Sequence, residues 1–169
     1  DDNVTTGGLP EDAQEGNTEC YNCKAGQYND EEGTHIRSGT HECKECEAGS
    51  YSASGLCEPC RVGSYSSSKG SSECTPCAAG RYGTSLSEGD AGNRSSIDEA
   101  CQHCAVGKYV NIQGSTTCFD CPPGSACNVT GMRDYKECDA GSMALKKESM
   151  ACLACAPGRY QNSTASATC

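Results

Sequence analysis

Residues 57–65 read Cys-Glu-Pro-Cys-Arg-Val-Gly-Ser-Tyr, and the pattern C-x-x-C-x-x-G-x-Y in this stretch recurs along the chain. The other full copies begin at Cys20, Cys43, Cys74, Cys101 and Cys152. Two copies are degenerate: Ala126 replaces the tyrosine in the copy that begins at Cys118, and Met143 replaces it in a copy that keeps a single cysteine, Cys138. Such self-similarity predicts a tandem repeat array rather than a globular enzyme.

The composition cannot supply a conventional hydrophobic core. Leu, Ile, Val and Phe number 5, 3, 5 and 1, together 14 of 169 residues. This is about 8%, well below the roughly 20% under which a chain is expected to be disordered. The chain has 17 cysteines, which is typical of disulfide scaffolds. We therefore expect a small disulfide-rich fold, an elongated tandem array of short β-hairpin repeats with little helix.

Cysteine at this density indicates an oxidising compartment, so we expect a secreted protein that is extracellular or on the cell surface. N-linked glycans are expected partners, with incidental sequons in a Ser/Thr-rich chain as the alternative. The candidate acceptors are Asn3, Asn93, Asn128 and Asn162. The net charge of −10 argues against nucleic acid and against anionic membranes as partners. With no apolar run of 18 residues, the segment is expected to lack a membrane span.

The cysteine spacing predicts the disulfides. We call the second cysteine of each C-x-x-C the opening cysteine, the first the closing cysteine, and name each repeat after its opening cysteine. Sequence alone does not establish connectivity, but pairing every opening cysteine with the next cysteine uses all except Cys20. The predicted bonds are Cys23–Cys43, Cys46–Cys57, Cys60–Cys74, Cys77–Cys101, Cys104–Cys118, Cys121–Cys127, Cys138–Cys152 and Cys155–Cys169. Cys20 is expected to be bonded upstream of residue 1 or to a neighbouring subunit, since an exposed thiol rarely persists in an oxidising compartment.

This pairing also predicts how the chain is divided. Residues 1–20 are the tail of an incomplete repeat, 20–121 hold five repeats, 121–138 are a degenerate repeat and 138–169 hold two more. Further repeats of the same chain or neighbouring subunits are the expected protein partners. The insertions at 29–42 and 83–100 are hydrophilic, so they are expected to be exposed, either as binding loops or as plain glycosylated loops. One helical turn is expected near 96–101.

Each repeat is expected to form one hairpin. The motif glycine adopts positive φ, and the tyrosine after it starts a strand, as in residues 63–67. A Ser/Gly/Asn-rich turn follows, and residues 71–74 return as the second strand of that example. The motif tyrosines are expected to cover the disulfide of their own repeat and to stack on the next repeat. A ligand-binding row of aromatic side chains is the alternative.

The sequence gives little support for a metal-binding, redox or catalytic site. Cys43, Cys46, Cys57 and Cys60 fit a zinc site loosely, and the acidic residues 30–32 could bind calcium. A thioredoxin-like C-x-x-C would need a strand and a helix around it. The sequence lacks the G-x-S-x-G, H-E-x-x-H and P-loop motifs. We therefore expect no catalytic residue, no metal ligand and no cofactor, and predict that the chain is not an enzyme.

The run at 57–66 resembles the ephrin-receptor-like cysteine-rich repeat, which is itself similar to the first module of tumour-necrosis-factor-receptor cysteine-rich domains. Residues 121–127 look like the C-P-x-G-x-x-C variant found in long arrays of that family. The resemblance implies extracellular rods whose opening cysteines bond to the next cysteine, as in protist surface antigens, flagellar-hair proteins and animal ectodomains. It does not imply one function.

Two functions are compatible with these features. The first is an extracellular rod-like structural glycoprotein of a coat, filament or cell-surface appendage. The second is a receptor or adhesin ectodomain that binds a protein ligand through its long loops. The uniform array and the lack of a chemical site favour the first.

Overall fold

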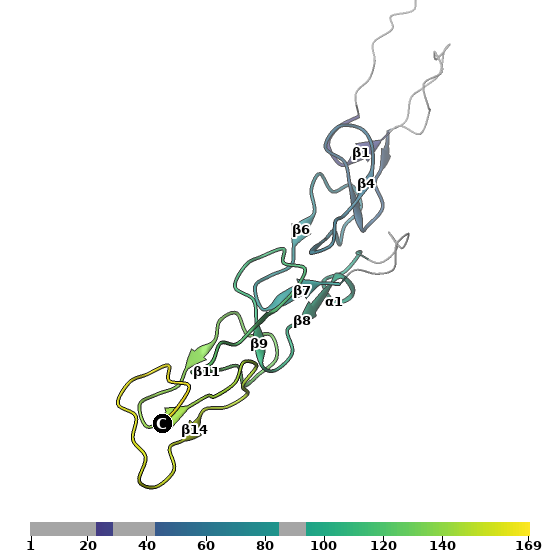
Figure 1. Cartoon of the computed structure of the whole chain (residues 1–169). Helices are drawn as coiled ribbons and strands as arrows, with labels where there is room; N and C mark the ends of the chain where they lie inside the picture. Colours follow the sequence, from purple (N-terminus) through teal and green to yellow (C-terminus); the bar gives the residue numbers. More distant parts are fainter. Residues whose placement is uncertain (1–22, 29–42, 85–93) are drawn as a thin grey trace, which may run out of the picture.

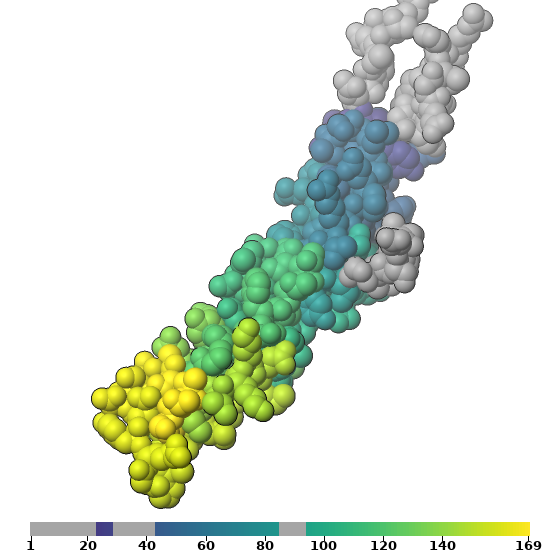
Figure 2. Space-filling model, in the orientation of Figure 1, coloured from purple at the N-terminus to yellow at the C-terminus, as the bar shows by residue number. Residues whose placement is uncertain are grey.

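The computed structural model describes residues 23–28, 43–84 and 94–169. These residues form an elongated rod in which successive repeats follow one another from end to end (Figure 1). The space-filling view shows the colours of the sequence in order along the rod, so that segments close in the chain are also close in space (Figure 2). The described part of the chain is therefore a linear array without a single central core.

Seven two-stranded antiparallel sheets make up the array. Six of the sheets pair the residues that follow a motif glycine with the dipeptide inside the next C-x-x-C, and in the remaining sheet Lys136 and Glu137 precede the single Cys138. Six pairs are β1 (Gln27–Tyr28) with β2 (Lys44–Glu45), β3 (Ser50–Tyr51) with β4 (Glu58–Pro59), β5 (Ser64–Tyr65) with β6 (Thr75–Pro76), β7 (Arg81–Gly83) with β8 (Cys101–His103), β9 (Lys108–Tyr109) with β10 (Phe119–Asp120) and β11 (Ser125–Ala126) with β12 (Lys136–Glu137). The seventh joins β13 (Ser142–Met143) to β14 (Leu153–Ala154). These hairpins and the near absence of helix confirm the predicted fold class.

The position of the returning strand differs from the prediction. Residues 71–74 are not a strand; Tyr65 pairs instead with Thr75, and Ser64 with Pro76. The reason lies in the backbone of Ser71, whose carbonyl accepts a hydrogen bond from the amide of Ser52 in the preceding repeat at 3.0 Å. Because this segment is hydrogen-bonded to a neighbouring repeat, the returning strand of its own hairpin lies further along the chain, between Cys74 and Cys77.

One helix, α1 (Ile97–Ala100), is present in the described residues, where a helical turn was expected. Ser96 caps it, since its hydroxyl accepts a hydrogen bond from the amide of Glu99. Ala100 is buried, and Ile97 packs against the cluster of Cys77, Ala100 and Cys101. The expectation that 83–100 is wholly exposed is therefore wrong at its end, because an apolar helix face completes the cover of a disulfide there.

The interior of the rod is a column of small side chains. Most opening cysteines are fully buried, and the residue that directly follows the motif tyrosine or its replacement is buried in every described case except Gln161, which is partly exposed. The buried residues after the tyrosine position are Ser52, Ser66, Gly83, Val110, Cys127 and Ala144. Close-packed small groups and disulfides thus take the place of a core of Leu, Ile and Phe.

In the described residues, three successive repeats meet at the motif glycines from Gly26 to Gly124. At Gly80, the carbonyl accepts the amide of Cys104 in the next repeat at 3.0 Å. The carbonyl of Cys104 accepts the amide of Gly131, one repeat further on, at 2.8 Å. The carbonyl of Gly131 lies directly against Gly80, where a Cβ atom would overlap it. With φ at +87°, Gly80 needs to be glycine for both its conformation and this close approach.

The same three-repeat junction recurs along the rod. Equivalent sets of motif glycine, opening cysteine and turn residue are Gly26, Cys46 and Gly70; Gly63, Cys77 and Gly114; Gly107, Cys121 and Glu148; and Gly124, Cys138 and Ala165. The turn residue has positive φ in every set, including the non-glycine residues Glu148 and Ala165. Each repeat therefore touches the next repeat and the one after it, which couples the array beyond nearest neighbours.

Candidate functional site

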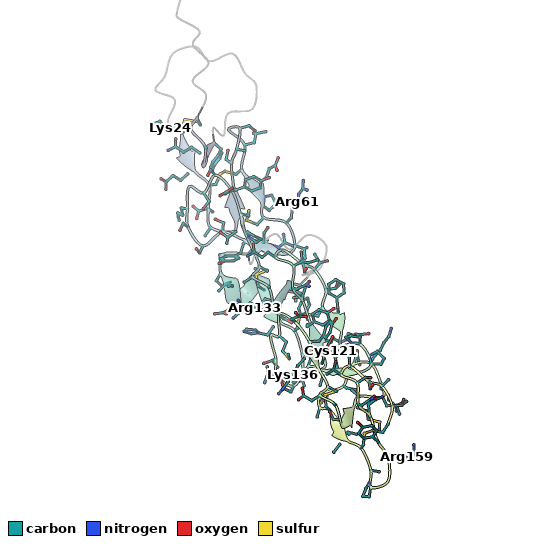
Figure 3. All side chains as sticks on the ribbon, turned by 90° about the vertical axis from the view of Figure 1, so that its left-hand side faces the viewer. Lys24, Arg61, Cys121, Arg133, Lys136 and Arg159 are labelled. Carbon is teal, nitrogen blue, oxygen red and sulfur yellow. A yellow bond between two sulfur atoms is a disulfide. The ribbon has the colours of Figure 1, made fainter. Side chains whose placement is uncertain are left out.

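The functional feature with the clearest geometry is the ladder of disulfides along the rod. The structure joins Cys23–Cys43, Cys46–Cys57, Cys60–Cys74, Cys77–Cys101, Cys104–Cys118, Cys121–Cys127, Cys138–Cys152 and Cys155–Cys169. These are the eight pairs named from the spacing, with Cα–Cα distances of 5.5–6.2 Å, in the usual range for disulfides. Figure 3 shows disulfides spread along the rod, and labelled basic residues from Lys24 near one end to Arg159 near the other.

The disulfides exclude the zinc site that the sequence allowed at four of the cysteines. Cys43, Cys46, Cys57 and Cys60 are all bonded to other cysteines. A disulfide sulfur is not a thiolate and therefore cannot serve as the usual zinc ligand. In the described ranges no group of three or more His, Cys, Asp or Glu side chains is placed to hold a metal ion.

The motif tyrosines lie on the flanks of the ladder. Tyr51 donates from its hydroxyl to Glu58 across the hairpin at 2.9 Å, and this hydrogen bond raises the pKa of Tyr51. Tyr65 packs against the cluster that contains the Cys77–Cys101 disulfide. That disulfide belongs to the next repeat, so Tyr65 packs on the repeat that follows its own, as expected. The cover of each tyrosine over the disulfide of its own repeat stays a prediction.

Ring stacking between motif tyrosines is not found among the described residues. Tyr109 does stack on the next repeat, as expected, because its ring contacts that of Tyr135 with centroids 5.1 Å apart; it also contacts Phe119, with centroids 5.9 Å apart. Tyr135 stands three residues before Cys138, where the other repeats have the closing cysteine. In this degenerate repeat an aromatic cluster replaces a disulfide at the surface, and burial raises the pKa of Tyr109.

The degenerate repeat also has a disulfide, but this bond lies in the interior of the rod. Cys127 occupies the buried position after the tyrosine site and bonds to Cys121, and both cysteines are fully buried. The importance of this buried position was not anticipated from the sequence. The sequence does carry a signal for it, because the residue after the motif tyrosine is small in most repeats.

A charged cluster links three consecutive repeats on the outside of the rod. The Lys108 ammonium bonds both Asp120 and Glu148. The hydrogen bonds to Asp120 and Glu148 raise the pKa of Lys108 to about 12. The bond from Lys108 lowers the pKa of Asp120. Glu148 is also the positive-φ turn residue of its junction, so this cluster reinforces a backbone contact already present.

The remaining predicted site residues divide into described and undescribed ones. Asn128 and Asn162 are exposed. Asn3, Cys20, Asn93, residues 29–42 and residues 85–93 of the 83–100 insertion lie outside the described residues. A shallow hollow of about 200 Å³ lies beside Asn128. No helix within the described ranges is long and apolar enough to cross a membrane.

Hairpins joined through C-x-x-C pairs and disulfide-bonded in series point to a known module. Residues 49–88 match the family model of the tyrosine-protein kinase ephrin type A/B receptor-like module. The match begins at the motif glycine Gly49 and contains the Cys60 repeat and the first part of the Cys77 repeat, so it confirms the resemblance seen in the sequence for this stretch. The comparison with curated proteins gave no significant match. An ephrin-receptor-like module with a disulfide in every repeat indicates an extracellular protein.

Proposed function

We propose that this chain is part of an extracellular rod-like structural glycoprotein that builds a coat, a filament or a cell-surface appendage. The observation that carries the proposal is the three-repeat junction at Gly80, Cys104 and Gly131 and its equivalents. Each repeat is hydrogen-bonded through its backbone to the next one and lies in close contact with the one after it, and a disulfide crosses each repeat. Bending such a rod requires breaking backbone hydrogen bonds in successive repeats, so the array resists deformation along its length.

The burial of the disulfides agrees with a structural role. Opening cysteines such as Cys60, Cys77 and Cys104 are fully buried, which shields the bonds from reductants. A net charge of −10 favours solubility of the individual chain before assembly. In this proposal Cys20 is bonded to an upstream segment or to a neighbouring subunit, and the second arrangement makes an assembly covalent along its length.

Electron microscopy of the native material tests the proposal. Regular fibres or a surface lattice that bind antibodies raised against this chain are the expected result. Small-angle scattering of the isolated chain adds a second test, with a radius of gyration well above the value of about 15 Å that a compact chain of this length would have. Dispersed single molecules bound to one protein ligand would contradict the structural role.

A receptor or adhesin ectodomain is the second candidate. It is favoured by large apolar side chains that the described surface leaves exposed, such as Leu145, Leu153 and Tyr160. Exposed apolar groups are common at protein-binding surfaces. Affinity capture with the native chain distinguishes the two functions, because a receptor retains one stoichiometric partner and a structural subunit retains copies of itself.

A further inference from the structure

The hollow beside Asn128 joins two consecutive repeats. The amide of Cys127 donates to the carbonyl of Ser149 at 2.9 Å. The residues that follow these two, Asn128 and Met150, both line the hollow, together with Ala151. Met150 is 61% exposed, so its apolar side chain is available to a group that enters the hollow.

Asn128 is also well placed for modification. Asn128, Val129 and Thr130 form the sequon and are all exposed. Gly131 follows with φ at +72°, so the sequon immediately precedes a turn. The sequon at 162–164 occupies the same place in its repeat, before Ala165 with φ at +54°. Asn162 does not line the hollow, and it therefore provides a matched control within the same chain.

We infer that Asn128 carries an N-linked glycan whose first N-acetylglucosamine ring packs in this hollow, against Met150 and Ala151. The inference rests on the extracellular location in the proposed function, because the modification occurs in the secretory pathway. In the transfer, the amide nitrogen of Asn128 bonds to the anomeric carbon of a lipid-diphosphate-linked oligosaccharide. The bond from that carbon to the diphosphate oxygen breaks, the lipid diphosphate leaves, and the amide loses one proton.

The size and lining of the hollow suit a sugar ring. Its volume of about 200 Å³ corresponds to roughly seven water molecules at about 30 Å³ each. Met150 and Ala151 offer apolar atoms to the ring and its N-acetyl methyl group, while Lys136, Glu137 and Asp139 offer polar groups to its hydroxyls. The glycan thereby covers Met150 and fastens the degenerate Cys121 repeat, which lacks the usual surface disulfide, to the Cys138 repeat.

Oxidation of methionine by peroxide measures this cover directly. The chain has three methionines, Met132, Met143 and Met150, so each can be followed by peptide mass spectrometry. The protein is secreted from a eukaryotic host as wild type, Asn128→Gln and Asn162→Gln. Met150 is expected to oxidise more slowly in wild type than in Asn128→Gln by about threefold or more. Asn162→Gln should match wild type, and Met132 should not change among the three proteins.

Enzymatic trimming keeps the test independent of the folding of a variant. An endoglycosidase that leaves a single N-acetylglucosamine on folded wild-type protein should preserve the slow oxidation of Met150. Equal oxidation rates with and without the glycan, or protection that disappears on trimming, would overturn the inference. An unmodified Asn128 beside a glycosylated Asn162 would also overturn it while leaving the extracellular location intact, so its failure is distinguishable from that of the proposed function.

Discussion

Arg94 donates a hydrogen bond from its guanidinium group to the backbone carbonyl of Cys60. At other junctions the opening cysteine's carbonyl accepts the amide of a positive-φ turn residue instead, as Cys104 accepts Gly131. The main chain of Arg94 lies against Gly49, and its own carbonyl accepts the amide of Ser66 at 3.0 Å. A side chain thus replaces a backbone donor at the repeat that carries the 83–100 insertion, and the array continues without a break.

Replacing Arg94 with alanine is expected to weaken this junction. The Cys60 carbonyl loses a charged donor, which costs about 1–3 kcal/mol. Hydrogen exchange at the amide of Ser66, which bonds to Arg94, should become faster. Arg61→Ala is the matched control, because that arginine is exposed and belongs to the same repeat as Cys60. Unchanged exchange at Ser66 in Arg94→Ala would show that the guanidinium does not hold the junction.

Gly80→Ala and Gly55→Ala separate conformational strain from close approach. The two glycines have nearly equal φ, +87° and +90°, so alanine meets the same backbone penalty of about 1–2 kcal/mol at either site. A Cβ on Gly80 meets the carbonyl of Gly131, while one on Gly55 meets nothing within 4 Å. Gly80→Ala should therefore destabilise by at least about 2 kcal/mol more, measured by denaturant unfolding. Equal losses would contradict the three-repeat junction.

Ala165→Gly is expected to be neutral or stabilising. Ala165 has φ at +54° at a turn position that is glycine in the Cys60, Cys104 and Cys121 repeats. Relief of the left-handed strain outweighs the extra flexibility of glycine by up to about 1 kcal/mol. Ala144→Gly is the comparison, since Ala144 is buried without positive φ and should lose stability on the same change. A clear loss of stability in Ala165→Gly would contradict the equivalence of these turns.

The order in which the disulfides are reduced should follow burial. Both cysteines are buried in Cys77–Cys101 and in Cys121–Cys127. Other bonds, such as Cys60–Cys74, have a closing cysteine that is partly exposed. Limited reduction of folded protein, followed by alkylation and non-reducing peptide mapping, should leave the two buried bonds until last. The same maps test the pairing itself, and bonds inside a C-x-x-C would refute it.

The Lys108 cluster predicts a response to high pH. The folded protein raises the pKa of Lys108 from its ordinary value of 10.5 to about 12, so its contribution to stability is complete below pH 10.5 and lost as the pH rises through about 12. The pKa of Asp120 is lowered, so its contribution is present above about pH 4 and is lost in acid. Lys108→Met should remove both effects in pH-dependent unfolding, and salt should weaken them in wild type. A wild-type profile in Lys108→Met would exclude the cluster as their source.

The sequence alone determined the features that depend on local chemistry. The spacing of the C-x-x-C pairs limits which cysteines can reach each other, and a glycine such as Gly63 at a fixed place after each opening cysteine announces positive φ. The shortage of Leu, Ile, Val and Phe excludes a single core. Consequently the repeat array, its disulfide-rich hairpins and the matching family module could all be predicted from the sequence.

The tertiary structure alone decided how the repeats hold one another. Backbone atoms make the contact of Gly80 with Gly131 and the hydrogen bond between Ser52 and Ser71. The pattern of side chains along the sequence therefore does not predict them. The location of the returning strand depends on which segments these contacts already occupy. Arg94 at the Cys60 carbonyl and Met150 beside Asn128 likewise require segments of different repeats to be superposed in space. The spacing of cysteines and glycines in the sequence determines the individual repeats of this protein. The packing of each repeat against the next two determines how the repeats are arranged as a rod.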